Sequence, residues 1–123
     1  QFDYAICNVT LQMVMYPEIL IKEMCRIARY QIISFPNFAF FLNRLDLLIN
    51  GRMPRVMIPG YKWFSTGHIH QFSLADFKDF CNMNNIQIVK AHYIFPKRIF
   101  FVPHLIFRPF PNLFASTAIF LTG

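Results

Sequence analysis

Polar side chains follow two apolar segments that the sequence predicts to be strands. They lie in Asn8-Val9-Thr10-Leu11-Gln12, after the run 4–7, and in Ser34-Phe35-Pro36-Asn37, at the end of the run 31–35. In open α/β sheets, ligands bind beyond the carboxyl ends of the strands, where amide and hydroxyl groups orient a small molecule. The alternative is that Asn8 and Asn37 only satisfy the backbone of turns. The pattern alone leaves both interpretations open.

No set of residues has the spacing of a catalytic or metal site. His68 and His70 could present two metal ligands on one face of an extended segment, but no acidic residue or third ligand follows at a recognisable spacing. No serine stands in a nucleophile elbow. The four glycines, Gly51, Gly60, Gly67 and Gly123, form no phosphate-binding loop. We therefore predict no metal and assign no catalytic residue, and whether the chain is an enzyme stays open.

The composition excludes several classes of protein. The chain has 123 residues with 55% hydrophobic and only 15% charged residues, so it must bury a core and is not disordered. Its net charge of +6 is spread along the sequence, and the densest stretch, 44–62, holds only four basic residues. This spacing argues against a nucleic-acid-binding surface. The longest uncharged stretches are shorter than the roughly 18 residues that a membrane span requires.

The cysteines and the N-terminus indicate the cellular setting. Cys7, Cys25 and Cys81 lie in apolar segments without a short pair spacing, which predicts buried thiols in a reducing compartment. No signal peptide is recognisable, so we expect a cytoplasmic location. The chain begins with Gln1 and enters a strand pattern at once. We expect it to be a piece of a larger protein.

The periodicity predicts an open α/β sheet. Strand 4–7, a helix from Pro17 with a buried stripe, and strand 31–35 form a βαβ unit, which implies parallel strands. A helix within 38–50 ends at Gly51, a long loop spans 52–71, and Ser73 caps a further helix. Strand 86–94, an aromatic and basic connector 97–112, and strand 118–122 complete the chain. The last two strands lack a crossover helix, which predicts an antiparallel pair. The expected helix stripe is Leu20, Met24, Ile27 and Ala28.

Several motifs, in order along the whole chain, resemble the MetW family of methionine biosynthesis proteins. They are Phe2-Asp3-Tyr4, Thr10-Leu11-Gln12, Glu23-Met24, Ser34-Phe35-Pro36-Asn37-Phe38, Gly51-Arg52-Met53-Pro54, Tyr61-Lys62-Trp63-Phe64, Ile69-His70, Asp76-Phe77 and Phe110-Pro111-Asn112-Leu113. The combination of the Ser-Phe-Pro-Asn-Phe and Gly-Arg-Met-Pro segments is the most specific part of the resemblance.

The resemblance implies the C-terminal half of a class I methyltransferase fold that uses S-adenosylmethionine. Residues 1–123 would form a partial single domain, with strands in the order 4-5-7-6 and an antiparallel strand 7. The glycine-rich loop and the acidic residue that hold the cofactor would belong to the absent N-terminal half. The family then implies that Asn8, Thr10, Leu11 and Gln12 form the remaining wall of the cofactor pocket. We expect S-adenosylmethionine to bind the longer parent and not this chain alone.

The resemblance also implies a partner. MetW-like proteins accompany homoserine O-acyltransferase, so the expected function is that of an accessory protein in methionine biosynthesis. The alternative is a methyltransferase that acts on an unidentified acceptor. Candidate substrate-contacting or partner-contacting residues are Ser34, Asn37, Arg52, Arg55, Trp63 and His70.

Overall fold

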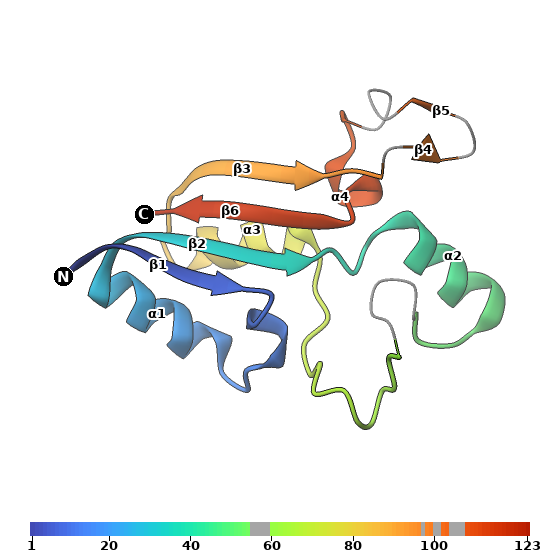
Figure 1. Ribbon diagram of the computed structural model, residues 1–123, viewed down its shortest axis with the longest axis horizontal. Helices are drawn as coiled ribbons and strands as arrows, with labels where there is room; N and C mark the ends of the chain where they lie inside the picture. Colours follow the sequence, from blue (N-terminus) through green and yellow to red (C-terminus); the bar gives the residue numbers. More distant parts are fainter. Residues whose placement is uncertain (55–59, 97, 100–101, 104–107) are drawn as a thin grey trace.

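Four strands form a mixed sheet in the order β1-β2-β6-β3 (Figure 1). The computed structural model describes residues 1–54, 60–96, 98–99, 102–103 and 108–123. The strands are β1 (Phe2–Asn8), β2 (Ala28–Pro36), β3 (Ile88–Ile94) and β6 (Thr117–Thr122). β1 and β2 are parallel, and β6 runs antiparallel to both of its neighbours. The predicted order 4-5-7-6 with an antiparallel strand 7 is therefore confirmed, and β1 lies at an edge of the sheet.

Local sequence signals set the ends of the helices. They are η1 (Leu11–Met13), α1 (Pro17–Ile27), α2 (Phe41–Asn50), α3 (Leu74–Met83) and α4 (Pro111–Phe114). Gly51 ends α2 in the left-handed conformation, with φ at 60°, and its N–H donates to the carbonyl of Leu47. Ser73 and Asp76 form a reciprocal capping box at the start of α3. Within the predicted connector, β4 (Arg98–Ile99) and β5 (Val102–Pro103) pair as a short antiparallel ribbon.

The core lies between the sheet and helices α1 and α3, which cover the same face (Figure 1). Phe120 of β6 is fully buried, and its ring centroid lies 4.8 Å from that of Phe77 and 5.8 Å from that of Phe35. Cys7 of β1 and Cys81 of α3 are buried in the same cluster, as predicted.

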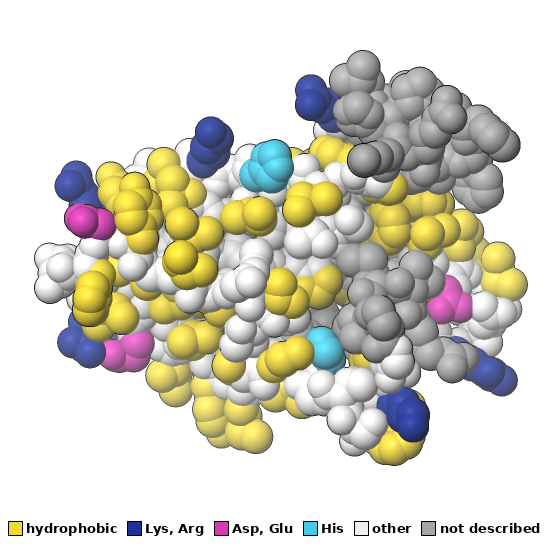
Figure 2. Space-filling model, viewed as in Figure 1, with side chains coloured by type: hydrophobic (Ala, Val, Ile, Leu, Met, Phe, Trp, Pro, Cys, Tyr) yellow, Lys and Arg dark blue, Asp and Glu magenta, His cyan; other side chains and the backbone are white. Residues whose placement is uncertain are grey.

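The other face of the sheet is open over β1. Phe2, Tyr4 and Ile6 are 68%, 56% and 69% exposed, and Figure 2 shows hydrophobic side chains gathered over this face. The apolar run 4–7 is typical of a strand covered on both faces, but the described residues cover only one face of β1. A short apolar run shows that both faces of a strand are apolar, but it does not show that both are covered by other elements of the same chain.

The buried stripe of α1 is rotated from the predicted one. Ile21 and Met24 are buried, whereas Ile27 and Cys25 are exposed. The predicted burial of Ile27 and Cys25 is therefore wrong. Ala28 is buried as the first residue of β2, because the helix ends at Ile27 and the chain becomes extended there. Among the described residues, no helix has the length and apolar character needed to cross a bilayer.

Candidate functional site

The carboxyl ends of β1 and β2 meet, and their polar side chains bond to each other. Asn8 lies opposite Ser34 in the parallel register. The Ser34 hydroxyl donates to Asn8 Oδ1 at 2.6 Å, and the N–H of Val9 is 3.1 Å from Ser34 Oγ and 3.0 Å from the Ser34 carbonyl oxygen. The structure therefore brings these two predicted site residues together at the edge where open α/β sheets bind ligands.

Val9 takes a strained backbone conformation at this point. Its φ is 49°, in the left-handed region that a β-branched residue rarely adopts. Such strain costs on the order of 1–3 kcal/mol and is concentrated at functional sites in proteins. The turn after β1 is thus held in place by the bonds to Ser34 against a local conformational preference.

The rest of the turn connects to the long loop before α3. Leu11 and Gln12 are buried at 3% exposure each, while the Thr10 hydroxyl donates to the Asn8 carbonyl at 2.8 Å. The Gln12 carbonyl accepts the N–H groups of Ile69 and His70 at 3.1 and 3.0 Å. His70 is thereby placed beside the turn, and its Nε2 lies 3.2 Å from the Met15 carbonyl oxygen.

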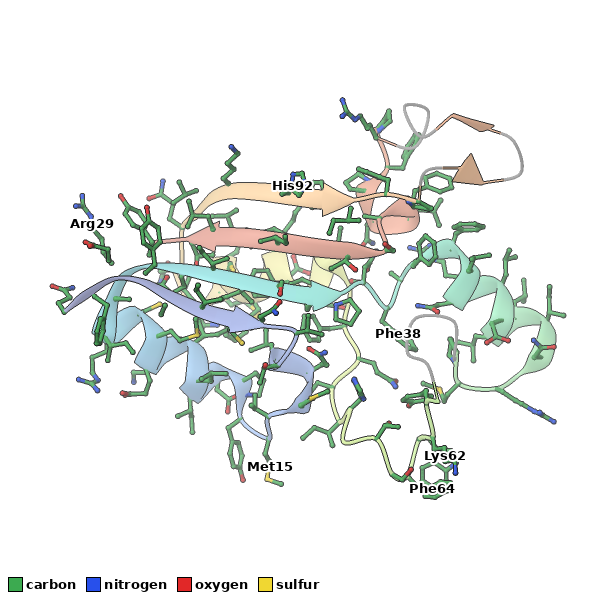
Figure 3. The ribbon with its side chains drawn as sticks, in the orientation of Figure 1. Met15, Arg29, Phe38, Lys62, Phe64 and His92 are labelled. Carbon is green, nitrogen blue, oxygen red and sulfur yellow. The ribbon has the colours of Figure 1, made fainter. Side chains whose placement is uncertain are left out.

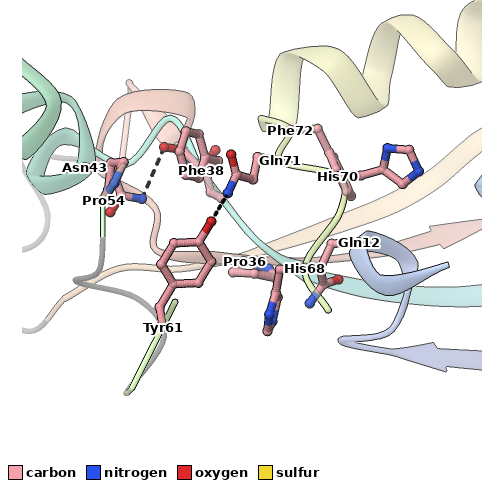
Figure 4. A pocket seen from close by; sticks show the side chains of 11 residues that line it. Gln12, Pro36, Phe38, Asn43, Pro54, Tyr61, His68, His70, Gln71 and Phe72 are labelled. Atoms are coloured by element: carbon pink, nitrogen blue, oxygen red, sulfur yellow. Dashed lines mark hydrogen bonds between the residues drawn. The ribbon is translucent and has the colours of Figure 1, made fainter. Parts of the chain in front are cut away.

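A small cavity of about 30 Å³ lies between this turn, the end of β2, α2 and the loop (Figure 4). Gln12, Asn37, Asn43, His68 and Gln71 provide polar groups to its lining. No Asp, Glu, Lys or Arg is among the described lining residues, so this lining is polar without a carboxylate, ammonium or guanidinium group. The Gln71 amide donates to the Tyr61 hydroxyl at 2.7 Å, which fixes one wall. Its aromatic and apolar lining residues are Pro36, Phe38, Pro54, Tyr61 and Phe72.

Asn37 lines this cavity, but its amide group is bonded to backbone. Its Nδ2 donates to the carbonyls of Asn112 and Ala115 at 2.9 and 2.8 Å, and its Oδ1 accepts the N–H of Ala39 at 3.2 Å. The side chain is fully buried. These bonds tie the end of β2 to the segment before β6, which favours the turn-satisfying interpretation of Asn37.

A second candidate surface lies on the loop side of the molecule. We call it the aromatic-basic surface; its residues are Arg52, Met53, Lys62, Trp63 and Phe64, which together with Tyr61 line a cavity of about 550 Å³. Trp63 is 76% and Phe64 70% exposed, with their rings edge to face at 5.6 Å. Figure 3 shows Lys62 and Phe64 on this outlying loop, away from the sheet. Arg55 lies outside the described residues, as does much of the predicted connector 97–112.

No metal centre is present in the part of the chain that the structure describes, and its two buried thiols are not activated. No three residues among its histidines, cysteines and acids are grouped to hold an ion. Burial raises the pKa of the Cys81 thiol to about 11 and also raises the pKa of Cys7, so both remain protonated near neutral pH.

The sequence interpretation did not identify Asn43, Tyr61, His68 and Gln71 as lining one cavity. A signal existed for Asn43, which is one of four polar residues in the otherwise apolar segment 41–50; in the structure it is only 2% exposed. No comparable signal marks Tyr61 or Gln71, because the loop that carries them has no periodicity.

Asn8, Thr10, Leu11 and Gln12, the four residues expected on the cofactor side, lie together at the end of β1 and in the turn after it. Leu11 and Gln12 are buried, and the side chains of Asn8 and Thr10 make local bonds. No glycine-rich loop is present in the sequence. The four residues do not by themselves fit S-adenosylmethionine.

Comparisons with known proteins agree with this architecture. The family model described as methionine biosynthesis protein MetW matches residues 1–122. Over 91 residues the chain is 40% identical to the bifunctional methionine biosynthesis protein MetXA/MetW of Rhodopirellula baltica. That match covers 72% of this chain and 14% of the relative, so the chain spans a small part of that protein.

A solved structure supports the fold. The crystal structure of the small RNA methyltransferase HEN1 matches 98% of this chain and 13% of its own chain, with a TM-score of 0.57. The sequence identity is 13%, so this likeness concerns the fold alone. It supports a methyltransferase-like α/β fold.

Proposed function

The chain belongs to the MetW family of methionine biosynthesis proteins, and we propose that it acts there as an accessory partner of homoserine O-acyltransferase. One observation carries this proposal. The relative from Rhodopirellula baltica is a bifunctional protein named MetXA/MetW, in which MetX denotes a homoserine acyltransferase. Fusion holds two modules at a high effective concentration, and this is useful when the separate proteins act as a complex.

The aromatic-basic surface is the best candidate for the contact with the partner. Trp and Arg are enriched among the residues that dominate binding energy at protein interfaces, and this surface contains both Trp63 and Arg52. The exposed aromatic rings of Trp63 and Phe64 leave apolar area in contact with water, which a partner would cover. Arg52 and Lys62 add positive charge, so the surface fits a partner with acidic residues around an apolar depression.

The test combines association with activity. Homoserine O-acyltransferase is assayed with and without the full chain, and complex formation is followed by size-exclusion chromatography. We expect co-elution and a rise in acyltransferase activity. If neither appears, the accessory role is refuted for this protein.

A matched pair of variants tests the surface separately. Trp63→Ala should weaken association by roughly tenfold or more, since truncating an interface hot spot costs about 2 kcal/mol. Met83→Ala serves as the control, because Met83 is 81% exposed and lies at the far end of α3. Equal effects of the two variants would exclude the aromatic-basic surface while leaving the partnership itself standing.

A second function is favoured by the methyltransferase-like fold together with the polar groups at the carboxyl ends of β1 and β2. In that proposal, the protein transfers a methyl group from S-adenosylmethionine to an acceptor, with Asn8, Thr10, Leu11 and Gln12 on the cofactor side. Alignment of donor and acceptor alone accelerates such a reaction, so the absence of a general base from the sequence motifs is weak evidence against it. A screen of methyl acceptors with the longer parent protein tests this proposal.

The cofactor-binding half is proposed to lie outside these 123 residues. These 123 residues by themselves should then bind S-adenosylmethionine weakly or not at all in a calorimetric titration. Tight binding would show that the residues of this chain suffice and would refute that division of the domain.

A further inference from the structure

Three buried polar atoms without a hydrogen-bond partner among the described residues all belong to the lining of one cavity. They are Gln12 Oε1, Asn43 Oδ1 and His68 Nδ1, and the cavity is the one between the β1 turn, α2 and the loop. Buried polar atoms in folded proteins are nearly always bonded, either to protein or to an ordered water. Three unpaired atoms on side chains that line one cavity therefore indicate that the cavity holds a polar group.

The two amides present oxygen atoms, and their orientation is set by other bonds. Gln12 Nε2 donates to the Val9 carbonyl at 3.1 Å, and Asn43 Nδ2 donates to the Phe38 carbonyl at 3.1 Å. Because each NH₂ group already donates to a backbone carbonyl, the unpaired atom of each side chain is an acceptor oxygen. Both side chains are buried, with exposed fractions of 3% for Gln12 and 2% for Asn43.

His68 completes the set from a third part of the chain. Its ring is held edge-on to Tyr61, with the centroids 6.2 Å apart, and its Nδ1 is the unpaired atom. In the tautomer with the proton on Nε2, Nδ1 is a third acceptor. Figure 4 shows that the three side chains come from η1, α2 and the loop before α3.

This lining selects for a donor and against an anion. A carboxylate or phosphate is an acceptor only and would face two fixed acceptor oxygens with no described Lys or Arg in the lining. An amine or a hydroxyl offers the N–H or O–H groups that the oxygens lack. The volume of about 30 Å³ accommodates a head group of one or two heavy atoms.

We propose that this cavity binds the hydrogen-bond-donating head group, a primary amine or a hydroxyl, of a small molecule. The proposal is independent of the acyltransferase partnership, because it rests on the unpaired acceptors alone. Asn43 and His68 are new members of the site at the carboxyl ends of β1 and β2, beside the predicted residue Gln12.

Nuclear magnetic resonance with small probes tests the proposal on the full chain. The probes are n-propylamine, 1-propanol and propionate, which share a three-carbon body and differ in the head group. We expect saturable shifts of the Gln12 and Asn43 side-chain amides and of the His68 ring with the amine or the alcohol, and none with propionate. Binding of the amine and not the alcohol would show that the cavity takes a cationic donor. Binding of the amine and the alcohol alike would show that it takes a donor irrespective of charge.

A matched histidine pair separates the site from general effects on the protein. His68→Phe keeps a ring against Tyr61 and should weaken binding of the donor probe roughly fivefold, the loss expected for one hydrogen bond. His92→Phe changes an exposed histidine on β3 and should leave binding unchanged. Neither variant changes a residue of the core, and the nuclear magnetic resonance spectra used for the titration also show whether each variant is folded.

Three results would overturn the proposal. One is a set of saturable shifts with propionate as large as those with the amine or alcohol. Another is donor binding that His68→Phe leaves unchanged. The third is no saturable shift with any probe, which would mean that water alone satisfies the three atoms. None of these results bears on co-elution with the acyltransferase.

Discussion

Asn37 provides the sharpest test of how the candidate site is held together. The change is Asn37→Ala, which removes the three side-chain hydrogen bonds to Asn112, Ala115 and Ala39. A net contribution of about 1 kcal/mol for each bond predicts a loss of roughly 3 kcal/mol in the free energy of unfolding. Because Asn37 is fully buried, the loss should not fall below this value, since the backbone groups bonded to its side chain would be left without partners.

Urea denaturation followed by circular dichroism measures this loss. With a slope of about 1–3 kcal/mol per molar urea, the midpoint should fall by roughly 1–3 M. Asn82→Ala, at an exposed position on α3, is the matched control and should change the midpoint little. A loss below about 1 kcal/mol for Asn37→Ala would refute the structural role and would favour a ligand-contacting role for this amide.

Three further predictions concern the core, the thiols and the strained turn. Phe120→Ala should lower the free energy of unfolding by about 3–5 kcal/mol in urea denaturation, because it opens a cavity among packed rings; a loss below about 2 kcal/mol would contradict the packing described. The pKa of Cys81 is raised to about 11 from an ordinary value of 9.0. The contribution of this buried neutral thiol to the free energy of unfolding is therefore fully present below pH 9 and is lost as the pH rises from 9 through 11. The decline in unfolding free energy over that range should become shallower in Cys81→Ala, and an unchanged slope would argue against the shift. Val9→Asn should raise the unfolding free energy by about 1 kcal/mol, since asparagine tolerates a positive φ better than valine, whereas a decrease in the thermal midpoint would show that the Val9 side chain contributes more than its strain costs.

Whether a feature of the fold could be predicted from the sequence depends on how far apart its interacting residues lie along the chain. The end of α2 at Gly51 and the start of α3 at Ser73 could be predicted, because both depend on residues within one helical turn. The pairing of β6 with β3 followed from the absence of a crossover helix between them. The rotation of α1 could not be read from periodicity, because Leu20 and Ile21 fit adjacent stripes equally well and only packing on the sheet chooses between them.

The candidate site likewise has some features that the sequence predicts and others that only the folded chain creates. The sequence by itself determined that polar residues follow two parallel strands, and the structure shows that Asn8 and Ser34 meet there. Only the tertiary structure decided the use of Asn37, whose Nδ2 is bonded to carbonyls 75 and 78 residues further along the chain. It also decided that Asn43 and His68 share a cavity with Gln12. These contacts join segments with no common local pattern, so they exist only once the chain has folded around its core.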